Sequence, residues 1–361
     1  MRKLMGGYYR EVLLLLASVL LGIIYMELVL RLFFVYESSS PMQNLETALK
    51  QSHVPGRGEN TTLGVMIRKS PHKDIIYEFR PNLDVFHDGI RIKTNSLGWR
   101  DDEFIKEKDR LTVRIAGLGD SDMYGDGIEA GSRYMNRIEE LLEEEHPEYD
   151  WEAYVFAIPG YDNVQEVAVL ETYGMDYEPD LIIYGFNQND VCPAGFIKRR
   201  RHVISMESFI RYYLRRTIHN IQTVYKKKVY NEIHSRGCDY DEMPEGLEHH
   251  YGKDNLVRSF RNMMRVGREN GIPVIFFTPR LSVEELKQEG YYVEDDNTTY
   301  IDAEPEKQEY LKRYTEDELM LSANSNHYNE IGNKMLAEAL VNDLERSGVL
   351  DKIMIRKLAC E

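Results

Sequence analysis

From residue 111 onward, short apolar runs alternate with stretches of helical periodicity, and this alternation limits the fold more than any other feature of the sequence. Apolar runs bounded by turn residues are typical of buried strands, and apolar positions three and four residues apart are typical of amphipathic helices. The pattern therefore predicts an α/β domain with a parallel sheet covered by helices on both faces. The expected strands are 113–118, 153–157, 181–184, 273–278 and a short fifth at 319–321, and the expected helices are 132–146, 164–173, 256–270 and 328–346.

Three of the expected strands end in small polar motifs, at the edge of a parallel sheet where ligands bind. The first strand ends in Gly119-Asp120-Ser121, the second in Pro159-Gly160-Tyr161 and the third in Asn187-Gln188-Asn189-Asp190, while His327 precedes the last helix. A serine at this position, next to a helix N-terminus, has the exposure that a nucleophile needs, and glycine N–H groups or side-chain amides can donate to an oxyanion. Each motif taken alone also fits an ordinary turn, a helix cap or a structural histidine.

Together and in this order, the four motifs resemble those of the SGNH (GDSL-type) hydrolases, and especially their membrane-anchored bacterial members. The resemblance covers residues from about 75 to 345, including the lead-in segments 77–82 and 94–100. It implies a flavodoxin-like fold with a five-stranded parallel sheet, and a serine esterase that uses neither metal nor cofactor. It also implies a role for four residues: Ser121 as nucleophile, His327 as general base, and Gly160 and Asn189 as oxyanion-hole donors.

The block around His327 departs from the family pattern, because the aspartate that usually lies two or three residues before the histidine is missing. Ser325 and Asn324 occupy these two positions. We therefore expect Asn324, or a main-chain carbonyl, to orient the imidazole, and Glu330 is a weaker candidate one helical turn further on. The third block differs as well, since Gly185 lies four residues before Asn189 where the family usually has two.

The N-terminus carries an apolar stretch at residues 12–36 that is long enough to cross a bilayer. Glu27 and Arg31 interrupt it at a spacing that allows them to pair on one helix face. A basic N-terminal flank predicts a cytoplasmic N-terminus and a translocated chain, and the absence of a small-residue cleavage site favours a retained anchor over a cleaved signal peptide. The expected parts are an anchor at 1–36, a linker or stalk at 37–71, and a hydrolase domain at 72–350 with lead-in strands at 72–110 and a helical insertion at 195–250.

Composition and charge narrow the range of partners. Hydrophobic residues make up 42% of the chain and charged residues 29%, as in folded globular proteins. The net charge of −16 opposes binding to nucleic acid phosphates. The three widely spaced cysteines (Cys192, Cys238 and Cys360) predict neither a disulfide framework nor a zinc site, and they leave one disulfide open.

These observations predict a membrane-anchored, extracytoplasmic serine esterase or deacylase. Its substrate would be an acyl ester, with the O-acetyl groups of a surface glycan as the leading candidate by family resemblance. An O-acyltransferase would use the same residues and differ only in its acceptor. Because the usual aspartate is missing, a catalytically degenerate protein that binds glycan or helps to assemble an envelope complex is the alternative from a different class.

Overall fold

A computed structural model describes residues 2–38, 54–194, 197, 246–322 and 326–359, and the chain divides into two compact units. The first unit comprises residues 1–44 and 199–232, and the second comprises residues 45–198 and 233–361. Most of the insertion expected at 195–250 and part of the linker expected at 37–71 lie outside the described residues.

The described part of the first unit is helix α1 (Arg2–Ser38). Within it, residues Arg10–Leu32 form a stretch that is long and apolar enough to span a membrane, and none of it is buried against other residues. Glu27 and Arg31 form the expected ion pair one helical turn apart, with 2.8 Å between charged atoms. The predicted N-terminal apolar helix is therefore present.

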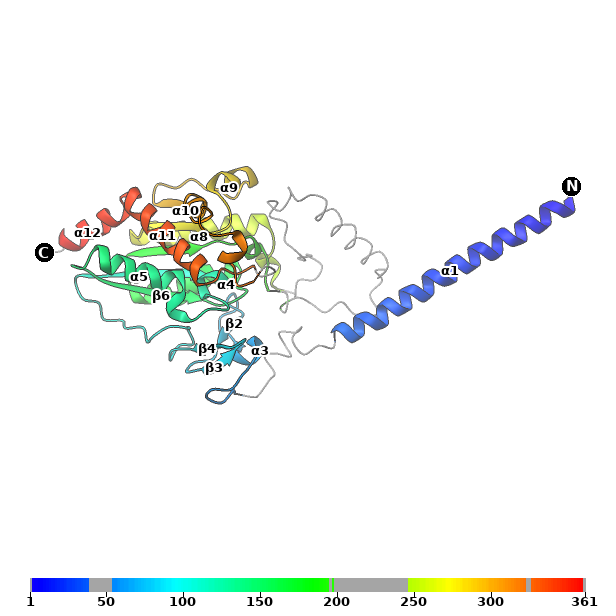
Figure 1. Ribbon diagram of the computed structural model, residues 1–361, viewed down its shortest axis with the longest axis horizontal. Helices are drawn as coiled ribbons and strands as arrows, with labels where there is room; N and C mark the ends of the chain where they lie inside the picture. The colour runs from blue at the N-terminus through cyan, green and yellow to red at the C-terminus, as the bar shows by residue number, and fades with distance from the viewer. Residues whose placement is uncertain (1, 39–53, 195–196, 198–245, 323–325, 360–361) are drawn as a thin grey trace. The chain divides into compact units, whose positions relative to one another are not determined.

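The centre of the second unit is a five-stranded sheet in which every neighbouring pair is parallel (Figure 1). Its strand order is β6-β5-β7-β8-β9, which is the flavodoxin-like order 2-1-3-4-5. The predicted fold class is thus confirmed. The strands are β5 (Thr112–Gly119), β6 (Asp150–Ala157), β7 (Leu181–Gly185), β8 (Val274–Thr278) and β9 (Thr298–Asp302).

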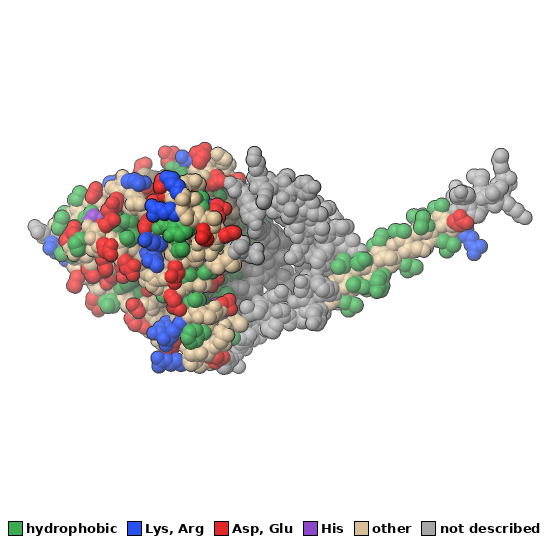
Figure 2. All heavy atoms as spheres, in the orientation of Figure 1, with side chains coloured by type: hydrophobic (Ala, Val, Ile, Leu, Met, Phe, Trp, Pro, Cys, Tyr) green, Lys and Arg blue, Asp and Glu red, His purple; other side chains and the backbone are tan. Residues whose placement is uncertain are grey.

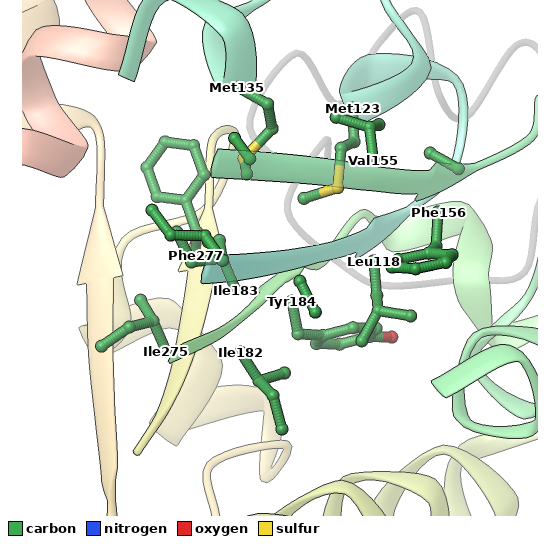
Figure 3. Packing of buried hydrophobic residues seen from close by; sticks show 14 of the residues in the cluster. Leu118, Met123, Met135, Val155, Phe156, Ile182, Ile183, Tyr184, Ile275 and Phe277 are labelled. Atoms are coloured by element: carbon green, nitrogen blue, oxygen red, sulfur yellow. The ribbon is translucent and has the colours of Figure 1, made fainter. Parts of the chain in front are cut away.

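Helices cover both faces of this sheet because its strands carry apolar side chains on both sides (Figure 3). Helices α5 (Tyr134–Glu145) and α11 (Glu330–Ser347) pack against each other, as do α6 (Asn163–Thr172) and α8 (Lys253–Asn270). On one face Met135 lies near Phe277 and Met123 lies near Val155, and on the other Leu118 lies near Tyr184. The remaining α-helices in the described part of this unit are α3 (Leu63–Met66), α4 (Ser121–Tyr124), α9 (Val283–Glu289), α10 (Glu304–Tyr310) and α12 (Val349–Ala359).

The prediction of a fifth strand at 319–321 is wrong. Leu319 ends a 3-10 helix (Glu316–Leu319), and Met320 makes only an isolated bridge to Tyr328. The actual fifth strand is β9, whose sequence Thr-Thr-Tyr-Ile-Asp lies at the sheet edge with only Ile301 fully buried. An edge strand that is half exposed needs no continuous apolar run, so apolarity alone does not reveal it.

The lead-in, which belongs to the second unit, folds into two small antiparallel hairpins whose apolar residues join the core of that unit. Strand β1 (Ile67–Lys69) pairs with β2 (Tyr77–Phe79), and β3 (Asp84–His87) pairs with β4 (Ile90–Lys93). The visible face of the second unit shows many Asp and Glu side chains and fewer Lys and Arg side chains, in keeping with the negative net charge (Figure 2).

Candidate active site

The register of the sheet places three of the sequence motifs at one edge. Gly119, the last residue of β5, pairs with Ala157 of β6 on one side and with Gly185 of β7 on the other. Ser121, Gly160 and Asn189 follow these three strand ends by only two to four residues. Parallel pairing therefore gathers the motifs beyond the carboxyl ends of adjacent strands, where α/β sheets bind ligands.

Ser121 is the first residue of α4, a single helical turn that begins directly after β5. Asp120 caps this turn by accepting a hydrogen bond from the Asp122 N–H at 3.2 Å. The turn packs so closely on the strand that a Cβ at Gly119 would lie 2.9 Å from the Met123 Cβ, so only glycine fits there. Small residues before Ser121 thus allow the sharp reversal that presents its hydroxyl at the sheet edge.

His327 reaches Ser121 from the other end of the chain. The distance from its Nε2 to the Ser121 Oγ is 2.9 Å, which is a hydrogen bond of the length that a nucleophile and its general base form. The His327 carbonyl accepts a hydrogen bond from the Leu321 N–H, and Asn329 caps α11 two residues further on. A serine and a histidine joined at the edge of a 2-1-3-4-5 sheet, with glycine and asparagine motifs beside them, match the arrangement expected from the sequence. The second unit therefore has the flavodoxin-like fold and the placement of motifs that the resemblance to SGNH hydrolases implies.

Comparisons with known proteins gave matches among solved structures only, since no family model and no curated protein matches the chain. An acetyl xylan esterase from Geobacillus stearothermophilus is 14% identical, with a TM-score of 0.39, over 66% of this chain and 97% of its own. A lipolytic protein of the G-D-S-L family from Desulfitobacterium hafniense is 11% identical, with a TM-score of 0.37, over 64% and 98%. A lipase from a goat rumen metagenome is 16% identical, with a TM-score of 0.37, over 63% and 95%.

An aspartate that was not among the expected site residues lies beside His327. The Asp126 Oδ2 is 3.9 Å from the His327 Nδ1, the ring nitrogen that does not face Ser121. Asp126 belongs to the loop after α4, far in sequence from the block that usually supplies the acid. Asn324 and Ser325 lie outside the described residues, and Glu330 is an exposed residue at the start of α11. The one sequence signal for Asp126 is its Gly-Asp-Gly context, which marks a tight loop five residues after Ser121.

Two arginines hold the loops on either side of this contact. Arg100, from the lead-in, is buried and donates to the carbonyls of Tyr124, Gly125 and Ile128 at 2.6–3.2 Å, so it fixes the loop that carries Asp126. Arg280 forms two hydrogen bonds to the Asp122 carboxylate at 2.7 and 2.8 Å and also donates to the Asn326 carbonyl. The nucleophile turn and the histidine loop are thus bridged by one guanidinium.

The third block, Asn187 to Asp190, contacts the buried carboxylate of Asp120. The side-chain amides of Asn187 and Asn189 donate to the two oxygens of Asp120 at 2.7 and 2.6 Å, and the Ser121 hydroxyl lies 3.3 Å from the same carboxylate. Burial raises the pKa of Asp120 above its ordinary value, against the opposing effect of the two amides. Because an amide group carries two N–H donors, Asn189 can hold Asp120 with one of them and keep the other for a ligand.

Gly160 of the second block has a φ of 79°, a left-handed conformation that favours glycine. A Cβ there would lie 2.9 Å from the Ala194 Cβ and 3.4 Å from the Tyr77 hydroxyl. That hydroxyl, from the lead-in, donates to the Pro159 carbonyl at 2.9 Å. The lead-in therefore supports the Gly160 loop through Tyr77 and the Ser121 loop through Arg100. The sequence predicted only short strands for the lead-in, and not this role.

Proposed function

We propose that the protein is a serine esterase in which Ser121 and His327 carry out acyl transfer to water. The observation that carries this proposal is the 2.9 Å contact between the Ser121 Oγ and the His327 Nε2 at the carboxyl edge of the sheet. A small pocket beside this pair is lined by Ser121, Gly125, Asp126, His327 and Leu336, among others. Ser121 and His327 are both partly exposed. A nucleophile bonded to its base where substrate can reach it is the arrangement that ester hydrolysis requires.

The reaction would proceed in two halves. The His327 Nε2 takes the proton of the Ser121 hydroxyl while the Oγ attacks the ester carbonyl, and the resulting imidazolium returns that proton to the departing alcohol. Water, deprotonated by the same nitrogen, then attacks the acyl-enzyme and releases the free acid and the serine. Asp126 would stabilise the imidazolium charge in both halves, because its carboxylate lies on the Nδ1 side of the ring.

The oxyanion would be held by the N–H groups of Ser121 and Gly160 and by the Asn189 amide. The first of these lies at the N-terminus of the α4 turn, and Asn189 is already fixed next to Ser121 through Asp120. Each such donor typically contributes about 10²–10³ to the rate. These roles are proposed from the positions of the three groups, because each group follows one of three neighbouring strands that pair in register.

Short acyl esters are the expected substrates, with O-acetyl groups on a surface glycan as the biological candidate. The test is the turnover of acetyl and octanoyl aryl esters by the full-length protein in mild detergent. We expect hydrolysis of the acetyl ester to exceed that of the octanoyl ester, because acetyl is the acyl group of the proposed substrate. Absence of turnover for both esters, with Ser121 inert to acylating reagents, would favour the binding-protein alternative, and acyl transfer to added glycan without net hydrolysis would favour the transferase.

We also propose that the hydrolase unit lies outside the cytoplasm. Support comes from the apolar stretch in α1 behind a basic N-terminus, and from Cys192, which is disulfide-bonded as expected in an oxidising compartment. The Arg57 side chain is 82% exposed, so trypsin added to cells with an opened outer barrier should cut there. A cytoplasmic marker protein should remain intact in the same sample. Protection of both proteins would place the unit in the cytoplasm.

A further inference from the structure

Away from the Ser121–His327 pair, three potential metal ligands meet from two distant segments. Asp74 lies in the lead-in, and His249 and His250 end a short 3-10 helix (Glu248–His250). Each offers one ligand atom, and the three atoms all lie within 4.8 Å of one another. A mixed set of two imidazoles and one carboxylate is the donor chemistry that Zn²⁺ and neighbouring first-row metals prefer.

His250 is prepared for such a role by its hydrogen bond to Asp162. Its Nδ1 lies 2.9 and 3.0 Å from the two Asp162 oxygens, and both side chains are fully buried. Asp162 also accepts hydrogen bonds from the N–H groups of Val164 and Gln165 as the cap of α6, so it serves as the acceptor and His250 Nδ1 as the donor. The Nε2 therefore carries the lone pair. A carboxylate that fixes one imidazole nitrogen and leaves the other for the ion is the usual support of a metal-bound histidine.

The Nε2 of His250 is buried and has no hydrogen-bond partner among the described residues. Leaving a buried polar nitrogen without a partner costs about 1–3 kcal/mol, so a ligand for this atom is expected. The neighbouring His249 Nε2 and Asp74 Oδ1 form a hydrogen bond of 3.0 Å, and this separation is close to the roughly 3.3 Å between two ligands of a tetrahedral zinc ion. Their side chains are 36% and 47% exposed, which gives an ion a path from solvent.

We propose that Asp74, His249 and His250 bind a divalent transition metal ion, with Zn²⁺ favoured by the ligand set, and that Asp162 orients His250. The site is structural, because Asp162 is the N-cap of helix α6 and lies two residues after Gly160. An ion held there ties the lead-in and residues 249–250 to the loop of the second block. This metal would take no part in ester hydrolysis, so the proposal stands independently of the function assigned to Ser121.

The test uses the full-length protein in detergent, stripped with EDTA and then titrated with Zn²⁺ by calorimetry. We expect one tightly bound ion per chain and a rise in the melting temperature on binding. His249→Ala and Asp74→Asn should each weaken binding roughly 100-fold, since each removes one of three protein ligands. Both side chains are partly exposed, so the variants should fold, and the melting temperatures of the EDTA-stripped proteins check this directly.

The matched control is His146→Ala. His146 lies with Glu145 and Glu345 in a second group of ligand atoms, but that group is exposed or half-exposed and contains one histidine. Binding that is lost in His249→Ala and kept in His146→Ala supports the proposed site. Wild-type protein that binds no Zn²⁺, or that binds it equally well in the His249→Ala variant, would overturn the proposal.

Discussion

Replacement of Ser121 by alanine should reduce the turnover of a short-chain aryl ester by a factor of about 10³ or more, because removing the nucleophile of a serine hydrolase costs up to about 10⁶ in kcat. Among the residues that the structure describes, the Ser121 hydroxyl has hydrogen bonds to His327 and Asp120 only, and Ser121 is not one of the buried core residues. The domain should therefore keep its fold. A melting temperature within a few degrees of that of the wild type would show that activity, and not stability, was lost.

Ser132→Ala is the matched control for this variant. Ser132 ends a 3-10 helix (Ala130–Ser132) just before α5 and does not line the pocket beside Ser121. The same chemical change there should therefore leave turnover unchanged. Full activity in Ser121→Ala would contradict the assignment of the nucleophile. Equal loss in both variants would indicate a shared effect on folding instead.

Replacement of Asp126 by asparagine should lower kcat by about 10²–10⁴ and leave KM nearly unchanged. In a serine protease triad, the corresponding change from aspartate to asparagine costs about 10⁴, because the imidazolium loses its counter-charge and its correct tautomer. The Asp126 carboxylate is partly exposed and lies at ion-pair distance from the His327 Nδ1, too far for a hydrogen bond. Its effect on kcat can therefore be smaller than that of a triad aspartate, and the expected range extends down to about 10² for this reason. The measurement is steady-state hydrolysis of the acetyl aryl ester.

Glu129→Gln removes the same charge three residues away, from an exposed position, and should leave kcat unaltered. Asn324→Ala tests the orienting residue expected from the sequence. If Asn324→Ala is slow and Asp126→Asn is as fast as the wild type, the histidine block supplies its own orienting group and the role proposed for Asp126 is wrong.

The sheet was predictable from the sequence because its inner strands are buried on both faces. β5, β7 and β8 consist of fully buried residues, which leave unmistakable apolar runs. Strand β9 has no such apolar run, because every residue in it except Ile301 is only partly buried. Helix α11 begins at Glu330, two residues after the expected start, because the Asn329 side chain accepts the Ile331 and Gly332 N–H groups and so caps the helix there.

Apart from His327, which the family resemblance indicated, the candidate site residues were predictable only where they follow strand ends. Ser121, Gly160 and Asn189 each come directly after a buried strand, so their proximity follows from parallel pairing. Asp126 and Arg100 meet the site through loop packing between segments that no periodicity connects. The same holds for the hydrogen bond between His250 and Asp162, which are 88 residues apart. Long-range contacts between loops leave no local pattern in one sequence.

The central claim is that Ser121 is an activated nucleophile, and its most direct test is covalent labelling with a fluorophosphonate. We expect the wild-type protein to be labelled at a single site that peptide mapping places on Ser121, and we expect no labelling of Ser121→Ala. His327→Ala should react far more slowly, because the hydroxyl then lacks the base 2.9 Å away. A wild-type protein whose Ser121 remains unlabelled under conditions that label other serine hydrolases would contradict the account and leave a binding protein as the better description.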